Sequence, residues 1–96
     1  MEINLTVIIK SKSEYRGEVK AILVNLVKNS RKESACLQYD LHQNIDDPNV
    51  FIFHEVWKNK EGLDFHQKQP YLSKLNEASD LYLDGEVKVY VTSRLG

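Results

Sequence analysis

The chain has 96 residues, a length at which a single hydrophobic core can close, so we expect residues 1–96 to form one domain. Its 13 Lys and Arg residues are scattered and balanced by 14 Asp and Glu residues, which argues against the basic surface that nucleic-acid binding requires. One cysteine excludes an internal disulfide and a C-x-x-C metal or redox pair.

The N-terminal segment MEINLTVIIK alternates apolar and mixed residues, which predicts a strand from Ile3 to Lys10. It has no basic n-region, and its apolar run stops at Lys10, so we expect neither a secretion signal nor a membrane span. The sequence therefore predicts a cytoplasmic protein.

A long amphipathic helix is predicted from about Glu14 to about Lys32. Ser11 and Glu14 have the spacing of a capping box, although Ser13 is an equally good N-cap. The apolar residues that follow recur at helical spacing.

Two β-rich runs, Cys36–Asn44 and Val50–Lys58, are separated by the turn-forming segment IDDPN. They predict a β-hairpin. We interpret Cys36 as a small residue at the start of a strand, since no His or Asn spacing marks it as a nucleophile.

The last third of the chain predicts a helix broken by a proline, then a final strand. A helical segment from Lys60 to about Gln69 meets Pro70, and a second helix runs from Tyr71 to about Leu83. An Asp-Gly turn precedes a strand over Glu86–Thr92. The order is that of an α+β, ferredoxin-like β-α-β-β-α-β fold, with a four-stranded antiparallel sheet and both helices on one face.

Strand parity separates the polar residues of FIFHEVWKNKEGLDFH, because successive side chains in a strand point to opposite faces. Glu55 and Trp57 share one face, and His54 lies on the other. The more apolar set is expected under the helices, and it comprises Ile3, Leu5, Val7, Ile9, Leu37, Tyr39, Leu41, Phe51, Phe53, Val87, Val89 and Val91.

The opposite face of the sheet mixes apolar residues such as Ile8, Ile52, Val56 and Tyr90 with polar ones. A second sheet packed against it explains such a mixture better than full exposure, so we expect a two-fold homodimer built sheet to sheet. His54 is expected beside Asp40 on this face as an ordinary hydrogen-bonded histidine. No three metal ligands converge, so we expect no metal site.

Glu55 is the exception on the helix side, because an unpaired carboxylate among Phe53 and Trp57 is costly. It requires a hydrogen-bond or charge partner, or its pKa rises and it becomes a functional group. His66 shares the inward side of the short helix. Two roles for His66 stay open, a hydrogen bond to the sheet or to Glu55, and contact with a ligand.

The segment from Ser30 to Leu75 closely resembles the central signature of the antibiotic biosynthesis monooxygenase domain family. Ala35 stands where the signature usually has glycine, which affects no functional position. The matching residues are Ser30, Arg31, Glu33, Cys36, Leu37, Tyr39, Leu41, Asp46, Asp47, Pro48, Phe51, Glu55, Trp57 and His66.

The resemblance implies a dimeric α+β barrel and, for its activity, oxygenation of a small phenol or quinol by dioxygen without a cofactor. An acidic quinol can be deprotonated to an anion that itself reduces dioxygen, so the protein need only bind, deprotonate and desolvate it. On this hypothesis His66 and Glu55 are the catalytic residues. The substrate-binding candidates are Trp57, Phe53, Tyr71, Tyr39 and Asn4.

Three alternatives remain open from the sequence. Haem degradation occurs in a divergent branch that uses Asn, Trp and His, which Asn4, Trp57 and His66 superficially match. Isomerisation of a phosphorylated signalling sugar would need a basic phosphate site, and the scattered Lys and Arg residues argue weakly against it. The third alternative is a dimeric binding module without catalytic activity.

Overall fold

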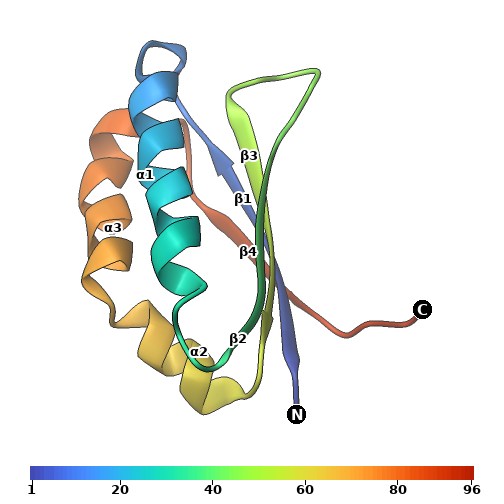
Figure 1. Ribbon diagram of the computed structural model, residues 1–96. Helices are drawn as coiled ribbons and strands as arrows, with labels where there is room; N and C mark the ends of the chain where they lie inside the picture. Colours follow the sequence, from blue (N-terminus) through green and yellow to red (C-terminus); the bar gives the residue numbers. More distant parts are fainter.

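A computed structural model describes residues 1–96, and its elements follow the predicted order (Figure 1). The strands are β1 (Ile3–Lys10), β2 (Cys36–Gln43), β3 (Val50–Trp57) and β4 (Lys88–Thr92). The helices are the 3-10 turn η1 (Ser13–Tyr15), α1 (Arg16–Ser30), α2 (Lys60–Gln67) and α3 (Pro70–Tyr82). The predicted ferredoxin-like α+β fold is confirmed.

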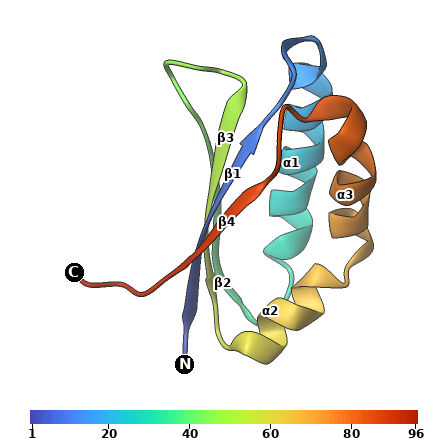
Figure 2. The same ribbon diagram turned by 180° about the vertical axis from the view of Figure 1, so that it is seen from behind.

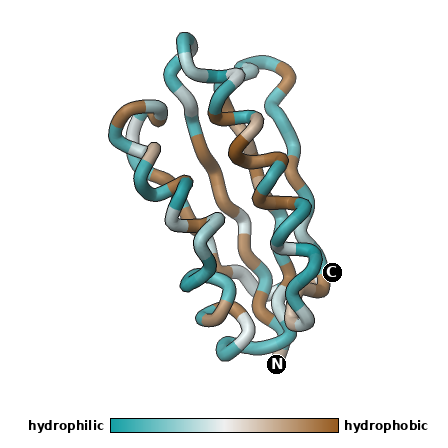
Figure 3. Tube along the Cα trace, turned by 60° about the vertical axis from the view of Figure 1, so that its left-hand side comes forward, coloured by the Kyte–Doolittle hydropathy of each residue, from teal (hydrophilic) through white to brown (hydrophobic).

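The four strands form one antiparallel sheet in the order β2-β3-β1-β4. Helices α1 and α3 lie side by side over one face, and no helix covers the other face (Figures 1 and 2). Apolar stretches run through the strands beneath the helices (Figure 3). None of the helices is both long and apolar enough to cross a membrane.

Pro70 and Gly85 lie at element boundaries that suit their backbone preferences. Pro70 occupies the first turn of α3, where its missing N–H costs no hydrogen bond, so it both ends the α2 region and starts the next helix. Gly85 adopts a φ of 91° in the turn before β4, as predicted. The predicted capping box is wrong, since neither η1 nor α1 has a side-chain cap and Ser11 instead forms a bridge with Leu83.

The core lies between the sheet and the helices, and strand parity predicts most of it. Leu5, Val7 and Ile9 are buried from β1, and Phe51, Phe53 and Trp57 from β3. The register places Glu55 opposite Leu5 and His54 opposite Thr6 on the two faces of the sheet. Asp40 lies opposite His54 across β2 and β3, as predicted, but the Asp40 carboxylate accepts hydrogen bonds from Arg31 and Gln38 rather than from His54.

The prediction of the inner face is wrong for one residue, and for β4 it holds in parity but not in burial. A register irregularity between Cys36 and Gln38 displaces Leu37, which is 52% exposed. Val89 and Val91 have the predicted parity, but they are 54% and 69% exposed because edge strand β4 extends past the helical layer. One edge of the inner face is therefore open.

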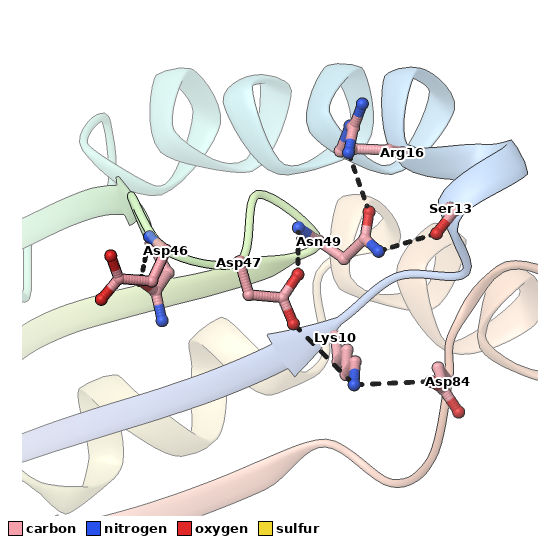
Figure 4. Close-up of polar contacts among 8 residues, drawn as sticks. Lys10, Ser13, Arg16, Asp46, Asp47, Asn49 and Asp84 are labelled. Atoms are coloured by element: carbon pink, nitrogen blue, oxygen red, sulfur yellow. Dashed lines mark hydrogen bonds and ion pairs between the residues drawn. The ribbon is translucent and has the colours of Figure 1, made fainter.

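Polar contacts tie the loops together at the end of the fold remote from α2 (Figure 4). Lys10 Nζ lies 3.9 Å from Asp47 Oδ2 and 3.7 Å from Asp84 Oδ2. Asn49 Nδ2 donates to Ser13 Oγ at 2.9 Å. These contacts join the β2–β3 hairpin to the loops that follow β1 and α3, although exposed ion pairs each contribute little to stability.

Close packing at the α2 end of the fold explains why residue 62 is a glycine. A Cβ at Gly62, in α2, would overlap the Cβ of Ala35 in the turn before β2. The Lys58 N–H also donates to the Ala35 carbonyl at 2.9 Å. Ala35 has no positive φ, so the alanine is unstrained there. This contact holds α2 against the turn that carries Glu33.

Candidate functional site

An apolar cavity of about 340 Å³ lies between the inner face of the sheet and helices α2 and α3. Four of the predicted site residues line it, namely Tyr39, Phe53, Glu55 and His66. Most of the remaining lining is aliphatic, and Val87 and Val89 form its wall at the open edge along β4. Its volume is at the small end of the range of about 300–1,000 Å³ typical of small-molecule sites.

Glu55 supplies the carboxylate of this cavity. Its position in β3 turns it toward the helices, and only 5% of its surface is exposed. Trp57, two residues along the same face, donates its Nε1–H to Glu55 Oε1 at 2.9 Å. Glu55 Oε2 has no hydrogen-bond partner in the chain, so it is free to meet a ligand.

The environment of Glu55 disfavours its charged form. Burial raises its pKa from 4.5 to about 7, the Trp57 hydrogen bond opposes this rise, and the charge of Glu33 adds to it. Glu55 thus has both of the properties anticipated from the sequence, a partner and a raised pKa. A carboxylate with a pKa near neutrality is well matched to accept a proton at physiological pH.

His66 reaches the cavity from α2, whose N-terminus is capped by Asn59 Oδ1 accepting from the Gly62 N–H at 2.8 Å. Its ring is 3% exposed and stacks on Trp57 at a centroid distance of 4.2 Å. Burial lowers the pKa of His66, and the bond to Glu33 opposes that effect. The ring is therefore favoured in its neutral form.

The hydrogen bond anticipated between His66 and Glu55 is not formed. Instead His66 Nδ1 lies 2.7 Å from Glu33 Oε2. The Tyr71 hydroxyl donates to the same oxygen at 2.5 Å, and burial and this bond raise the pKa of Tyr71. Glu33 is itself nearly buried, with 7% of its side chain exposed, and its Oε1 has no partner.

Sequence reasoning missed the role of Glu33. It lies in the turn between α1 and β2, within the charged run SRKES, where periodicity carries no information. Its burial depends on α2 and the start of α3 packing over that turn. The only signal in the sequence was its place among the residues that match the family signature.

The aromatic candidates form one group beside these polar residues. The Tyr39 ring lies 5.0 Å from that of Phe53 and 5.5 Å from the ring of His66. Burial, with the nearby charge of Glu55, raises the pKa of Tyr39, so its hydroxyl stays protonated. Tyr39 can therefore donate a hydrogen bond to a ligand in the cavity.

Three predicted substrate-binding residues lie outside the cavity lining. Trp57 is fully buried beneath His66, and Tyr71 is engaged with Glu33. Asn4 is paired with Val56 and Thr92 and lines a polar hollow together with His54, a residue of the helix-free face. Leu5 and Glu55 border both this hollow and the cavity.

Cys36 occupies the first position of β2, as predicted. Burial raises the pKa of its thiol to about 11. The thiol is thus protonated at neutral pH, which fits a structural residue better than a nucleophile.

Comparisons with known proteins show which family the chain belongs to. Residues 3–78 match the model of the antibiotic biosynthesis monooxygenase family. The chain is similar to the Bacillus subtilis protein named "Putative monooxygenase YcnE", with 34% identity over 86 residues that cover 85% of this chain and 90% of that protein.

Two further relatives extend the comparison. Protein sll1783 of Synechocystis is 33% identical over 84 residues, which cover 85% of this chain but only 57% of that longer protein. The crystal structure of PA3566 from Pseudomonas aeruginosa superposes with a TM-score of 0.92 at 29% identity, covering 99% of this chain and 95% of that one. The chain belongs to the antibiotic biosynthesis monooxygenase family.

Proposed function

We propose that the protein is a cofactor-independent monooxygenase that acts on a small quinol or phenol. The observation that carries this proposal is Glu55, a buried carboxylate with a pKa of about 7 and a free oxygen, on the wall of an apolar cavity. His66 and Tyr39 line the same cavity, and no group of the chain bonds to His66 Nε2, whereas the Tyr39 hydroxyl lies beside the Ser30 side chain. Two proton acceptors are thus available to a ligand.

In the proposed reaction, Glu55 accepts a proton from a quinol hydroxyl. This proton transfer produces an electron-rich quinolate, and the apolar walls limit its contact with water. The quinolate passes one electron to dioxygen, and the resulting radical pair joins to form a carbon–oxygen bond. Loss of water from the hydroperoxide leaves a hydroxylated quinone. One oxygen atom enters the product, the other leaves as water, and the quinol supplies all the electrons.

The cavity supports this substrate class over the other activities considered. A phosphorylated sugar and the carboxylates of haem both need cationic partners in a buried site. No Lys or Arg side chain lines the cavity, and its only ionisable lining residues are Tyr39, Glu55 and His66. An uncharged aromatic molecule with hydroxyl groups is the better match.

Oxygen uptake tests the proposal. Metal-depleted protein is mixed aerobically with a panel of benzene and naphthalene quinols, and the product is analysed by mass spectrometry after reaction under ¹⁸O₂. We expect one dioxygen consumed per quinol and one ¹⁸O atom in the hydroxyquinone. Rates no greater than the protein-free background across the panel, or a product without ¹⁸O, would contradict the proposal and leave a binding module as the alternative.

We also propose that the protein acts as a homodimer in the cytoplasm, with the helix-free faces of two sheets packed together. That face carries half-buried Ile8, Ile52 and Val56 and exposed Tyr90, which supports a covering partner. Light scattering during gel filtration should give twice the chain mass of 11.2 kDa. A mass of one chain at micromolar concentration would count against the dimer.

A further inference from the structure

Glu33 is the least expected buried acidic side chain in the protein, because no Lys or Arg side chain pairs with it. Its Oε2 instead receives two hydrogen bonds, from His66 at 2.7 Å and from the Tyr71 hydroxyl at 2.5 Å. Glu33 is not part of the cavity lining, whereas His66 is. Besides its charge, which adds to the raised pKa of Glu55, Glu33 can act on a ligand through its contact with the histidine.

The contact between Glu33 and His66 determines which ring nitrogen carries the proton. Glu33 Oε2 already accepts from the Tyr71 hydroxyl, and a carboxylate oxygen only accepts hydrogen bonds, so the hydrogen between Oε2 and His66 lies on Nδ1. A neutral imidazole has one donor nitrogen and one acceptor nitrogen. Nε2 is then the acceptor, and no group of the chain bonds to it.

Packing prevents the ring from turning over. One face of His66 lies on the indole of Trp57 at a centroid distance of 4.2 Å. Tyr39 approaches edge-on at 5.5 Å. A ring flip would place Nδ1 away from Glu33 and would leave the buried carboxylate without one of its two donors.

We propose that Glu33 is a positioning residue that holds His66 as the Nδ1–H tautomer, so that Nε2 presents its lone pair to a substrate hydroxyl in the cavity. The acceptor role rests on the function proposed above, whereas the tautomer does not. A quinol with two hydroxyl groups then meets two separate acceptors, Glu55 Oε2 and His66 Nε2. The site thus favours a dihydroxyarene over a simple phenol.

The tautomer is directly measurable by ¹⁵N NMR of histidine-labelled protein at pH 8, where long-range couplings distinguish protonated from bare ring nitrogens. The chain has 3 histidines, and a His66→Gln spectrum assigns the signals of His66. We expect a protonated Nδ1 and a bare Nε2 in the unmodified protein. A proton on Nε2 would overturn the proposal without any variant.

Two variants separate positioning from general packing. Glu33→Met keeps the side-chain volume but removes the acceptor, and we expect a substantial part of the His66 population to move its proton to Nε2. Tyr71→Phe removes the other donor to the same oxygen and serves as the matched control, with the Nδ1–H tautomer retained. An unchanged tautomer in folded Glu33→Met protein would refute the role of Glu33.

Kinetics test the acceptor role. Loss of a correctly oriented proton acceptor typically costs about 10²- to 10⁴-fold, so kcat for quinol oxidation should fall by at least tenfold in Glu33→Met while KM changes little. An unchanged kcat with a shifted tautomer would refute the acceptor role. If no quinol is oxidised by the unmodified protein but His66 is the Nδ1–H tautomer, the proposed function fails and the tautomer assignment stands.

Discussion

Glu55→Gln is expected to lower the rate of aerobic quinol oxidation by about 10²- to 10⁴-fold, the usual contribution of a positioned general base. The amide keeps the shape of the side chain but cannot accept the proton. In the unmodified protein, kcat/KM should rise with pH to a plateau above pH 7, because the pKa of Glu55 is about 7 and the base must be ionised. The variant should lose this inflection.

The measurement is a pH series of initial rates corrected for protein-free oxidation, since quinols also ionise and react unaided at high pH. Glu61→Gln makes the same chemical change on the exposed side of α2 and is the matched control. It should retain the full rate and the inflection. Equal activity of Glu55→Gln and Glu61→Gln would show that Glu55 takes no part in the reaction. An unchanged rate in His66→Ala would show the same for His66.

The stability of Glu55→Gln should depend on pH differently from that of the unmodified protein. The pKa of Glu55 is raised from 4.5 to about 7 by folding, so between these values the folded state binds the proton more tightly than the unfolded state. The free energy of unfolding of the unmodified protein therefore falls as pH rises through this window. The loss contributed by Glu55 is about 3 kcal/mol at most, at 1.36 kcal/mol for each pKa unit.

Urea unfolding at pH 4.5 and pH 8 measures this effect. The free energy of unfolding of the unmodified protein is subtracted from that of Glu55→Gln at each pH, and the contributions of the other titrating groups largely cancel in this difference. That difference should shift by up to about 3 kcal/mol in favour of Glu55→Gln as pH rises. Glu61→Gln should show no comparable shift. A pH-independent difference would mean that Glu55 is not desolvated in the folded state.

The expected pH dependence of the rate and that of the stability have one cause. Folding buries the Glu55 carboxylate and only partly compensates for its lost contact with water. Trp57 provides one hydrogen bond, and the second oxygen has none. A group that weakens the fold at neutral pH is explained more easily by a role in the reaction than by packing.

Strand parity predicted the part of the site that lies on the sheet. Alternation alone placed Glu55 and Trp57 on the helix side and His54 on the other, and the observed register confirms this. The two-residue period is a local property of the backbone, so it is readable from the sequence. Helical spacing placed His66 on the inward side of α2 in the same way, and His66 is buried.

Features that depend on tertiary packing could not be predicted in this way. Glu33 lies in a turn, and its burial requires α2 and α3 to pack over it, so the sequence pointed to the sheet or Glu55 as the partner of His66 and missed Glu33. The irregularity that displaces Leu37 depends on the pairing of β2 with β3. The exposure of Val89 and Val91 depends on where the helical layer ends.

The most direct test of the central claim, that Glu55 ionises a hydroxyarene in the cavity, is an anaerobic absorption titration with 4-nitrophenol, which resists oxidation and is coloured as its anion. At pH 7, where about half of Glu55 is ionised, we expect saturable binding to the unmodified protein with part of the bound phenol as the anion, and binding to Glu55→Gln as the neutral phenol with loss of the anion band. Binding without the anion band in the unmodified protein, or the same anion fraction in both proteins, would contradict the account.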